Sequence, residues 1–255
     1  MHKLTPSASC LQALLVMLPV LGVSSVVQAQ TTPLVQITAD GASAICRTVP
    51  PNPFHSRSVV QGAGPKGEAV VQFDLTPTST PSQFYLGWAC GEFPAGPADA
   101  PRYARVLFRV LSPLNVTGNG DPWTDKFLIV GDPHGDRVIV DLKPLSGYSD
   151  LNVMAQKGVG GGPTAPLKIG QWQCAQFELS ASGVKTYLNR TDRSKPNVTL
   201  NQGFNPTAWT NFNVGFYSNA TLAQNGRVSF QIARAEYDDE FDPAFCAAPP
   251  KPPAE

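Results

Sequence analysis

The feature that most constrains this chain is the alternation of apolar and polar residues along many short segments. In Arg105-Val-Leu-Phe-Arg-Val-Leu111, one side carries Val106, Phe108 and Val110, and the other side carries both arginines. A period of two is typical of β-strands, and no segment beyond the N-terminal residues sustains the 3.6-residue apolar period of a helix. Gly (22) and Pro (25) are abundant and only 15% of residues are charged, so we expect a loop-rich β protein.

The alternation predicts about ten short strands after an extended entry at residues 34–37. The expected strands are 68–75, 83–90, 105–111, 126–130, 137–142, 151–156, 171–179, 184–189, 212–217 and 228–233. We expect a hairpin across residues 180–183, a Gly-rich loop at 158–163 and a Pro-rich loop at 49–53, with His55 also in a loop. Short strands separated by Gly and Pro turns favour an all-β fold, a two-sheet antiparallel jelly-roll sandwich.

The N-terminal residues have the layout of a secretory signal peptide. Two basic residues, His2 and Lys3, precede an apolar stretch at 11–27, which closes on the small-residue cleavage pattern Val27-Gln28-Ala29. We therefore predict a signal peptide at 1–29, one jelly-roll domain at 30–246 and a disordered Pro-rich tail at 247–255. The chain is expected to be secreted, to the cell exterior or a periplasm, with no membrane span.

Cysteine usage supports export. Removing the signal leaves four cysteines, and an even number in an exported chain predicts two disulfides in one of three connectivities. Because domain termini often lie close together, the preferred pairing is Cys46 with Cys246 and Cys90 with Cys174.

The charge balance excludes one class of partner. Without Lys3 the chain has 18 basic and 19 acidic residues, a net charge of −1, and it contains no basic run. Nucleic acid is therefore not an expected partner. The mature chain is expected to be a monomer.

The stretch from Arg105 to Tyr237 resembles the concanavalin A-like lectin/glucanase superfamily, especially its laminin-G-like and polysaccharide-lyase-like members. The resemblance is carried by Gly170-Gln-Trp-Gln-Cys-Ala-Gln-Phe-Glu-Leu179, Val184-Lys-Thr-Tyr-Leu-Asn189 and Phe212-Asn-Val-Gly-Phe-Tyr217. These segments are similar to the Gly-x-Trp strand, its partner strand and the late strand of that superfamily. The resemblance implies a jelly roll and favours glycans as ligands, but it implies no particular reaction.

Two sets of residues are candidates for catalysis. In alginate-lyase-type enzymes a similar order of polar strand residues neutralises a uronate and removes a proton, which here would involve Arg109, Gln156 and Tyr217. The family's histidine and its Tyr-x-Lys-x-Gly pattern are absent, so ordinary strand-surface residues are the favoured interpretation. The second set is Glu236, Asp238 and Glu240, which resembles the acidic strand motif of related glycoside hydrolases. Asp239 breaks that pattern, which favours a solvated strand end or part of a calcium site.

No cofactor and no metal are expected, apart from a possible structural calcium. Asp121, Asp125, Asp132 and Asp136 lie in loops around Gly-Asp-Pro turns, and such loops can supply oxygen ligands, although Asp is also an ordinary turn residue.

Binding is the function that the sequence supports best. Exposed aromatic rings can stack on sugars, and amides can bond their hydroxyl groups. The candidate ligand residues are Trp209, Tyr217, Asn213, Gln156, Arg109 and Tyr187, whereas Trp172 is expected in the core. We therefore predict a lectin-like protein that recognises a polysaccharide on a concave polar face. A polysaccharide lyase or glycoside hydrolase is the first alternative, and a structural or adhesive surface protein is the second.

Overall fold

The computed structural model describes part of the chain. Its backbone is described at residues 33, 35–39, 55–75, 84–92, 100–111, 125–131, 137–145, 148–155, 159–201, 211–218 and 228–247. Side chains are described chiefly at 57–74, 100–111, 167–201 and 229–247, which belong to one sheet and its loops. All of these residues lie in the unit Pro33–Glu255.

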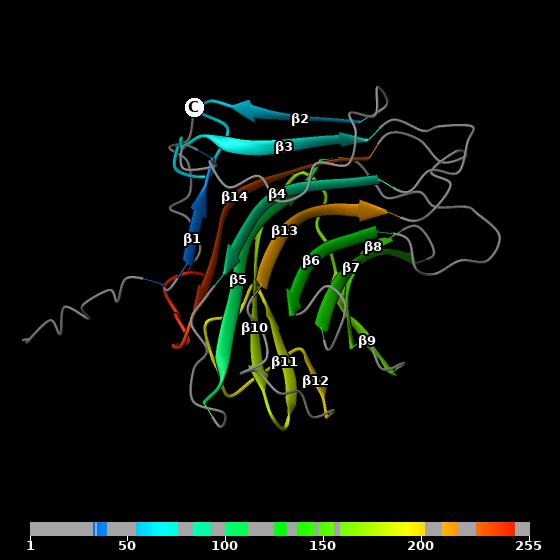
Figure 1. Cartoon of the computed structure of the whole chain (residues 1–255), viewed down its shortest axis with the longest axis vertical. Coiled ribbons are helices and arrows are strands. Elements are labelled where there is room, and N and C mark those ends of the chain that lie inside the picture. The colour runs from blue at the N-terminus through cyan, green and yellow to red at the C-terminus, as the bar shows by residue number, and fades with distance from the viewer. Residues whose placement is uncertain are drawn as a thin grey trace, which may run out of the picture. The chain divides into compact units, whose positions relative to one another are not determined.

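The described residues form strands and loops, and every strand pairing among them is antiparallel (Figure 1). The first sheet has eight strands. Seven follow the order β12 (Val198–Leu200), β11 (Gly183–Leu188), β10 (Trp172–Ser180), β5 (Arg102–Val110), β14 (Val228–Asp238), β3 (Val70–Leu75) and β2 (His55–Val60), and β1 (Val35–Thr38) also pairs with β14. The six-stranded sheet follows the order β4 (Phe84–Glu92), β13 (Asn211–Ser218), β6 (Asp125–Gly131), β7 (Arg137–Leu145), β8 (Tyr148–Ala155) and β9 (Val159–Pro166).

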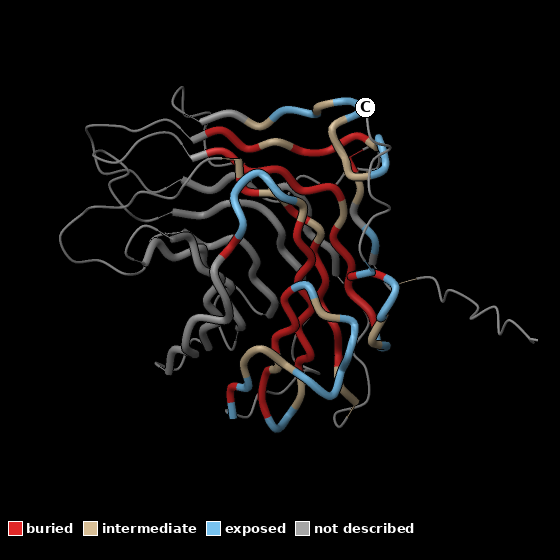
Figure 2. The backbone as a smooth tube through the Cα atoms, turned by 180° about the vertical axis from the view of Figure 1, so that it is seen from behind, coloured by how far each residue is buried: buried red, intermediate tan, exposed pale blue. Residues whose placement is uncertain are grey.

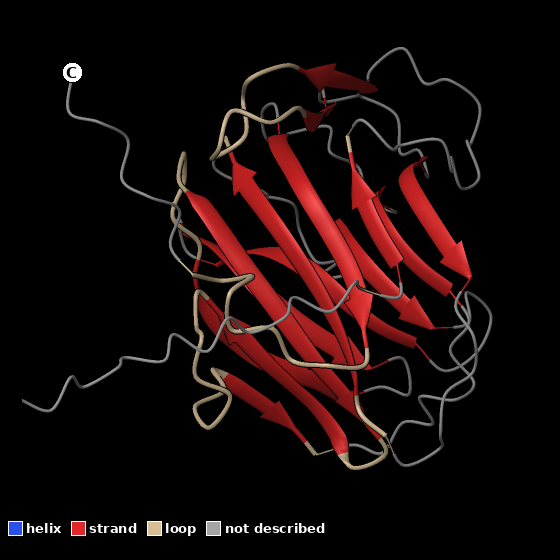
Figure 3. Ribbon diagram, turned by 90° about the vertical axis from the view of Figure 1, so that its left-hand side faces the viewer, coloured by secondary structure: helices blue, strands red, loops and turns tan. Residues whose placement is uncertain are grey.

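The core lies on the face of the eight-stranded sheet that the other sheet covers. Val106, Phe108 and Val110 of β5 are fully buried there, as the alternation in the sequence predicts. Phe73 of β3 and Phe230 of β14 are also fully buried, and their rings stack with centroids 4.8 Å apart. Figure 3 shows the strands in two layers, and Figure 2 shows how continuous the burial is along the eight-stranded sheet. The predicted two-sheet antiparallel sandwich is therefore confirmed.

Most predicted strands are present, and the errors have a common cause. Residues 159–163 of the segment expected as a Gly-rich loop at 158–163 belong instead to β9, which pairs with β8 at the edge of its sheet. An edge strand tolerates Gly and Pro because one side of its backbone needs no partner strand. His55 begins strand β2 rather than lying in a loop, and β2 is likewise the last strand in the order of its sheet.

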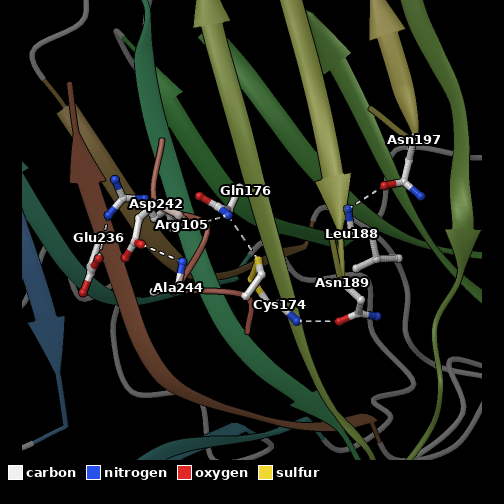
Figure 4. The surroundings of a disulfide bond; sticks show 10 residues. Arg105, Cys174, Gln176, Leu188, Asn189, Asn197, Glu236, Asp242 and Ala244 are labelled. Carbon is white, nitrogen blue, oxygen red and sulfur yellow. Dashed lines mark hydrogen bonds and ion pairs between the residues drawn. A yellow bond between two sulfur atoms is a disulfide. The ribbon is translucent and has the colours of Figure 1, made fainter. Parts of the chain in front are cut away.

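The disulfide in the described residues differs from the predicted pairing. Cys246 is bonded to Cys174, with their Cα atoms 5.3 Å apart, so the pairing of Cys46 with Cys246 and of Cys90 with Cys174 is wrong. The two ends of the domain do meet, since β1 pairs with β14. The chain then continues beyond β14 across β5 to β10, where Cys174 lies, and this carries Cys246 to Cys174 (Figure 4).

No helix among the described residues is both long enough and apolar enough to cross a membrane.

The corrected bond leads to a prediction for two other cysteines, Cys46 and Cys90. With Cys174 and Cys246 joined, we expect Cys46 and Cys90 to form the second disulfide. Mass spectrometry of an unreduced digest of the protein, expressed with its N-terminal segment in a host that exports it, should find both linked peptide pairs, and reduction should separate them. A free thiol at Cys46 would contradict this expectation.

Gly183 is the position where the sheet most strictly requires glycine. Its φ is +145°, and a Cβ built there would lie 2.0 Å from the backbone carbonyl oxygen of Leu200 in the paired strand β12. We expect Gly183→Ala to lower the free energy of unfolding in urea by about 1–3 kcal/mol more than Gly170→Ala does. Gly170 is the matched control, because its φ is +76° but a Cβ there would meet nothing within 4 Å. Equal losses in the two variants would show that the close approach of Leu200 is unimportant.

Candidate functional site

The face of the eight-stranded sheet that points away from the second sheet carries a straight line of polar side chains. Strand register places one residue from each of five neighbouring strands in this line, which we call the Trp172 row. In order across β2, β3, β14, β5 and β10, its members are Ser58, Gln72, Gln231, Arg109 and Trp172. Four strand spacings make the row about 19 Å long.

Hydrogen bonds join the middle of the Trp172 row. Arg109 donates from Nε and Nη2 to Oε1 of Gln231, over 3.1 and 2.5 Å, and Gln231 donates from Nε2 to Oε1 of Gln72 over 2.7 Å. Gln72 in turn donates from Nε2 to a carboxylate oxygen of Asp74 over 2.8 Å. Each amide is therefore held in one orientation. A ligand that bound here would not have to order these side chains, so their conformational entropy would not oppose binding.

Arg109 and Trp172 form the aromatic end of this row. The guanidinium carbon of Arg109 lies 4.9 Å from the centroid of the Trp172 ring, within range of a cation–π interaction. Both side chains are partly exposed, so Trp172 is not the core residue that its place in the sequence suggested. Partial burial lowers the pKa of Arg109, but the guanidinium keeps its charge at any physiological pH.

A second line, the Arg105 row, crosses the same face. In order across β1, β14, β5, β10 and β11, its members are Gln36, Glu236, Arg105, Gln176 and Tyr187. Arg105 is only 2% exposed, and it donates to Glu236 over 2.9 Å (Figure 4). It also donates to Asp238 over 2.8 Å. The same Glu236 accepts a hydrogen bond from Gln36 over 2.9 Å and pairs with Arg234 over 3.2 Å.

Residues Asp239–Ala247, which follow β14 and which we call the strap, cover the Arg105 row. Arg105 donates to the backbone carbonyl of Glu240, and Gln176 donates to that of Asp242 over 2.9 Å. The rings of Phe241 and Tyr187 meet with centroids 5.2 Å apart. The Cys174–Cys246 bond then fixes the end of the strap to β10.

A third polar group surrounds Glu178 of β10. Its carboxylate accepts hydrogen bonds from Lys185 and Arg193, both over 2.9 Å, and from the Tyr187 hydroxyl over 3.2 Å. Burial alone would raise the pKa of Glu178, but the hydrogen bonds and positive charges of Arg193 and Lys185 outweigh burial and lower it. Burial and the nearby Glu178 carboxylate raise the pKa of Tyr103 to about 12, so this phenol stays neutral.

Two of the three acidic residues proposed from the sequence as a catalytic motif, Glu236 and Asp238, are buried and paired with Arg105. Glu236 and Asp238 share one face of β14, as predicted, but they are 3% and 2% exposed rather than a solvated strand end. Glu240 lies beyond the end of β14 and is exposed, so the three carboxylates do not form one line. Burial raises the pKa of Asp238, and its hydrogen bond and ion pair with Arg105 oppose that effect.

The structure places two of the lyase-type residues, Arg109 and Tyr217, in different sheets. Arg109 lies on the outer face of the eight-stranded sheet, whereas Tyr217 belongs to β13 in the other sheet. Gln156 lies outside the described residues.

The other predicted ligand residues divide between the two sheets. Tyr187 is fully buried beneath the strap, so it is not an exposed sugar-stacking ring in this structure. Asn213 lies in β13, where only the backbone is described, and Trp209 lies outside the described residues. Of the predicted ligand residues whose side chains are described, Arg109 is the one on a partly open surface.

The sequence interpretation missed Gln72, Gln231 and Trp172 as members of one row, although a signal for part of it exists. In β14 the buried apolar residues change from even to odd positions, from Phe230 and Ile232 to Ala235 and Tyr237. This change marks the β-bulge between Ile232 and Arg234, which brings Gln231 and Glu236 to the same face.

Metal ligands are not grouped in the part of the chain that the structure describes. No cluster of three or more His, Cys, Asp or Glu residues with suitable geometry occurs there. Asp121, Asp132 and Asp136 of the proposed calcium loops lie outside the described residues, and only the backbone of Asp125 is described.

Comparison with known proteins gives fold-level similarities only. No family model matches the sequence, and no curated protein matches it. Among solved structures, the cellulose-induced protein Cip1 is 14% identical, with a TM-score of 0.49 over 76% of this chain and 90% of that one. The family 7 alginate lyase AlgAT5 is 13% identical (TM-score 0.40, 66% and 77% covered). Domain 4 of the arabinanase AbnA from Geobacillus stearothermophilus is also 13% identical (TM-score 0.35, 74% of each chain covered).

At these identities and TM-scores the neighbours determine neither the ligand nor the reaction. The strand order itself defines the class of protein, an antiparallel two-sheet sandwich such as the concanavalin A-like resemblance implies. The outer face of the eight-stranded sheet in this chain carries a partly exposed polar row and a second polar row beneath a disulfide-bonded strap.

The lowered pKa of Glu178 predicts a pH-dependent contribution to stability. A carboxyl whose pKa is lowered by folding stabilises the protein above its unfolded pKa of about 4.3, and this stability is lost as pH falls through the folded pKa. At pH 7 we expect Glu178→Gln to lower the free energy of unfolding by about 1–2 kcal/mol, since exposure of Lys185 and Arg193 weakens both pairs. Urea denaturation at pH 7 and at pH 3 should show that the difference in unfolding free energy between Glu178→Gln and the original protein is smaller at pH 3. An equal difference between the two proteins at pH 7 and at pH 3 would contradict this expectation.

Proposed function

We propose that this chain is an exported β-sandwich protein that binds polysaccharide through the Trp172 row. The observation that carries the proposal is the in-register line of Gln72, Gln231, Arg109 and Trp172 on a face that the second sheet does not cover. The row is linear and about 19 Å long, which suits an extended chain of several sugar rings better than a compact ligand.

The chemistry of the row matches that of a sugar chain. The flat face of an indole packs against the C–H groups of a pyranose ring, and such a ring brings a large contact area with little side-chain freedom to lose. The partly exposed amide of Gln72 carries both donors and acceptors, which is what neighbouring hydroxyl groups require, and the buried amide of Gln231 holds it in place. Arg109 connects the aromatic end of the row to its middle, since it contacts the Trp172 ring and donates a hydrogen bond to Gln231.

Burial of the paired carboxylates supports binding rather than cleavage. A glycoside hydrolase of the two-carboxylate type needs both groups next to the scissile bond, one to protonate the leaving group and one to attack or activate water. Glu236 and Asp238 are instead bonded to the same guanidinium and closed from solvent by the strap. A sugar chain in the Trp172 row would have no access to them.

The proposal is tested by retention on polysaccharides and by two variants. On a panel of cellulose, xylan, β-glucan, alginate and pectate, we expect the mature protein to be retained by at least one member without cleaving it. Trp172→Ala should weaken affinity for that polysaccharide about tenfold, the scale of one lost aromatic stacking contact. Arg109→Met keeps the packing of the side-chain stem and should weaken binding similarly. Isothermal titration calorimetry with soluble fragments gives the affinities.

Controls separate a lost contact from a damaged fold. Ile169→Ala removes an exposed apolar side chain that lies near Trp172 but outside the row, and it should bind like the original protein. Urea denaturation should show all three variants folded. New reducing ends or unsaturated uronate absorbance would indicate an enzyme, and retention by no member of the panel would favour a structural role. Unchanged affinity of Trp172→Ala would remove the Trp172 row from the proposal.

A further inference from the structure

The strap packs on a polar surface of the sheet, which is unusual for a segment that packs on its own domain. All five members of the Arg105 row are polar. Four of them, Glu236, Arg105, Gln176 and Tyr187, are buried, as are Asp238 and Glu178 beside them, whereas Gln36 at the β1 end is exposed. Removing such groups from water is unfavourable unless each finds a new partner, so segments that cover a sheet permanently generally do so over apolar side chains.

The strap does not provide hydrogen-bond partners for all of the polar atoms that it covers. Oε1 of Gln176 and Nε of Arg105 are buried, and neither has a hydrogen-bond partner in the described part of the structure. Gln176 is fully buried and Arg105 is 2% exposed, so water does not reach them freely. Each of these atoms can bond one more group than the strap provides.

The apolar attachment of the strap is confined to its end, where Phe245 and Cys246 form a small cluster with Cys174 and Leu107. Within Asp239–Ala247 only Phe245 and Cys246 are buried, and most of the other residues are exposed. The polar contacts of the strap are made by the backbone carbonyls of Glu240 and Asp242, which accept from Arg105 and Gln176, and by the Asp239 carboxylate, 3.8 Å from Arg102. Two phenylalanine rings complete the cover, Phe241 against Tyr103 and Tyr187, and Phe245 beside Arg105.

These contacts are of the kinds that a polysaccharide would make. A carbonyl oxygen on Arg105 or Gln176 takes the place of a sugar hydroxyl, and the Phe241 ring lies over tyrosines that could face a pyranose. The Arg105 row runs across the same face as the Trp172 row, and it is displaced from it by four residues of β5, or about 13 Å. One face of the sheet therefore carries two lines of similar length and chemistry, one partly exposed and one covered for the most part by the strap.

We propose that the Arg105 row is a second polysaccharide-binding line, which the strap occupies while Cys174–Cys246 is intact and which opens when a dithiol reduces that bond. The choice of polysaccharide as ligand rests on the function proposed above, whereas release of the strap does not. One thiolate of the dithiol attacks one cysteine sulfur, which releases the other cysteine and forms a mixed disulfide. The second thiolate of the dithiol then attacks its own sulfur in the mixed disulfide and releases the remaining cysteine. Cys174 and Cys246 each gain one proton and become thiols, and the dithiol is oxidised to its own disulfide.

Release of the strap is tested without any ligand. In the double variant Cys174→Ala/Cys246→Ala, we expect backbone hydrogen exchange of residues 240–247 to rise at least a hundredfold, while β5, β10 and β14 stay protected. Chymotrypsin should then cleave after Phe241 and leave the rest of the domain intact. Phe241→Ala/Phe245→Ala, which keeps both cysteines, should loosen the strap in the same direction and replaces the first variant if that one does not fold. Unchanged protection of the strap in the folded variant overturns the proposal.

Opening of the binding line is tested on the same polysaccharide panel in a Trp172→Ala background, where the open row is disabled. Adding Cys174→Ala/Cys246→Ala should increase affinity for a panel member at least tenfold. A further Tyr187→Ala change should remove that gain, although it leaves the strap released. A loosened strap with no gain in affinity overturns the second line. Failure of Trp172→Ala to weaken binding in the intact protein would instead overturn only the function proposed for the Trp172 row.

Discussion

The structure of the outer face depends on one buried guanidinium. Arg105 lies between Glu236 and Asp238, and all three side chains are almost completely removed from solvent. Burying such a group is favourable only when the geometry is good and the remaining donors have partners, and loss of one partner from a buried pair generally costs about 3–5 kcal/mol. Arg105 therefore fixes the register of β5 against β14 and, through the carbonyl of Glu240, the direction in which the chain leaves the sheet.

The bulge in β14 makes this arrangement compatible with the core. Side chains alternate between the faces of a strand, so an unbroken β14 could not place both Gln231 and Glu236 outward. The extra residue near Ala233 changes the alternation, which leaves Phe230, Ile232, Ala235 and Tyr237 all buried. One irregularity thus gives a continuous apolar face toward the second sheet and two polar rows on the opposite face.

Much of the fold could be predicted from the sequence because alternation is a local property. Val106, Phe108 and Val110 are buried as their spacing requires, and the hairpin at residues 180–183 forms where Gly183 allows it. The strap could not be predicted in the same way, since residues 239–247 have no periodicity and their place depends on Arg105, Gln176 and Cys174 in distant strands. The correct disulfide could not be chosen for the same reason: proximity of the termini is a general tendency, whereas the route of the strap is a property of this chain.

The candidate site could be predicted from the sequence only where a single strand was enough to identify the residue. Arg109 was a candidate because it follows a strand pattern, but its neighbours in the Trp172 row come from four different strands and become visible only with their register. Register also separates Arg109 from Tyr217, since residues on opposite sheets of a sandwich cannot share a groove on an outer face. The strands present both rows on the same face. The strap covers the Arg105 row and leaves the Trp172 row uncovered, so the strap rather than the strands makes the two rows differ. A chain with the same strands but no Cys246 would keep both rows and lose the covalent bond that closes one of them.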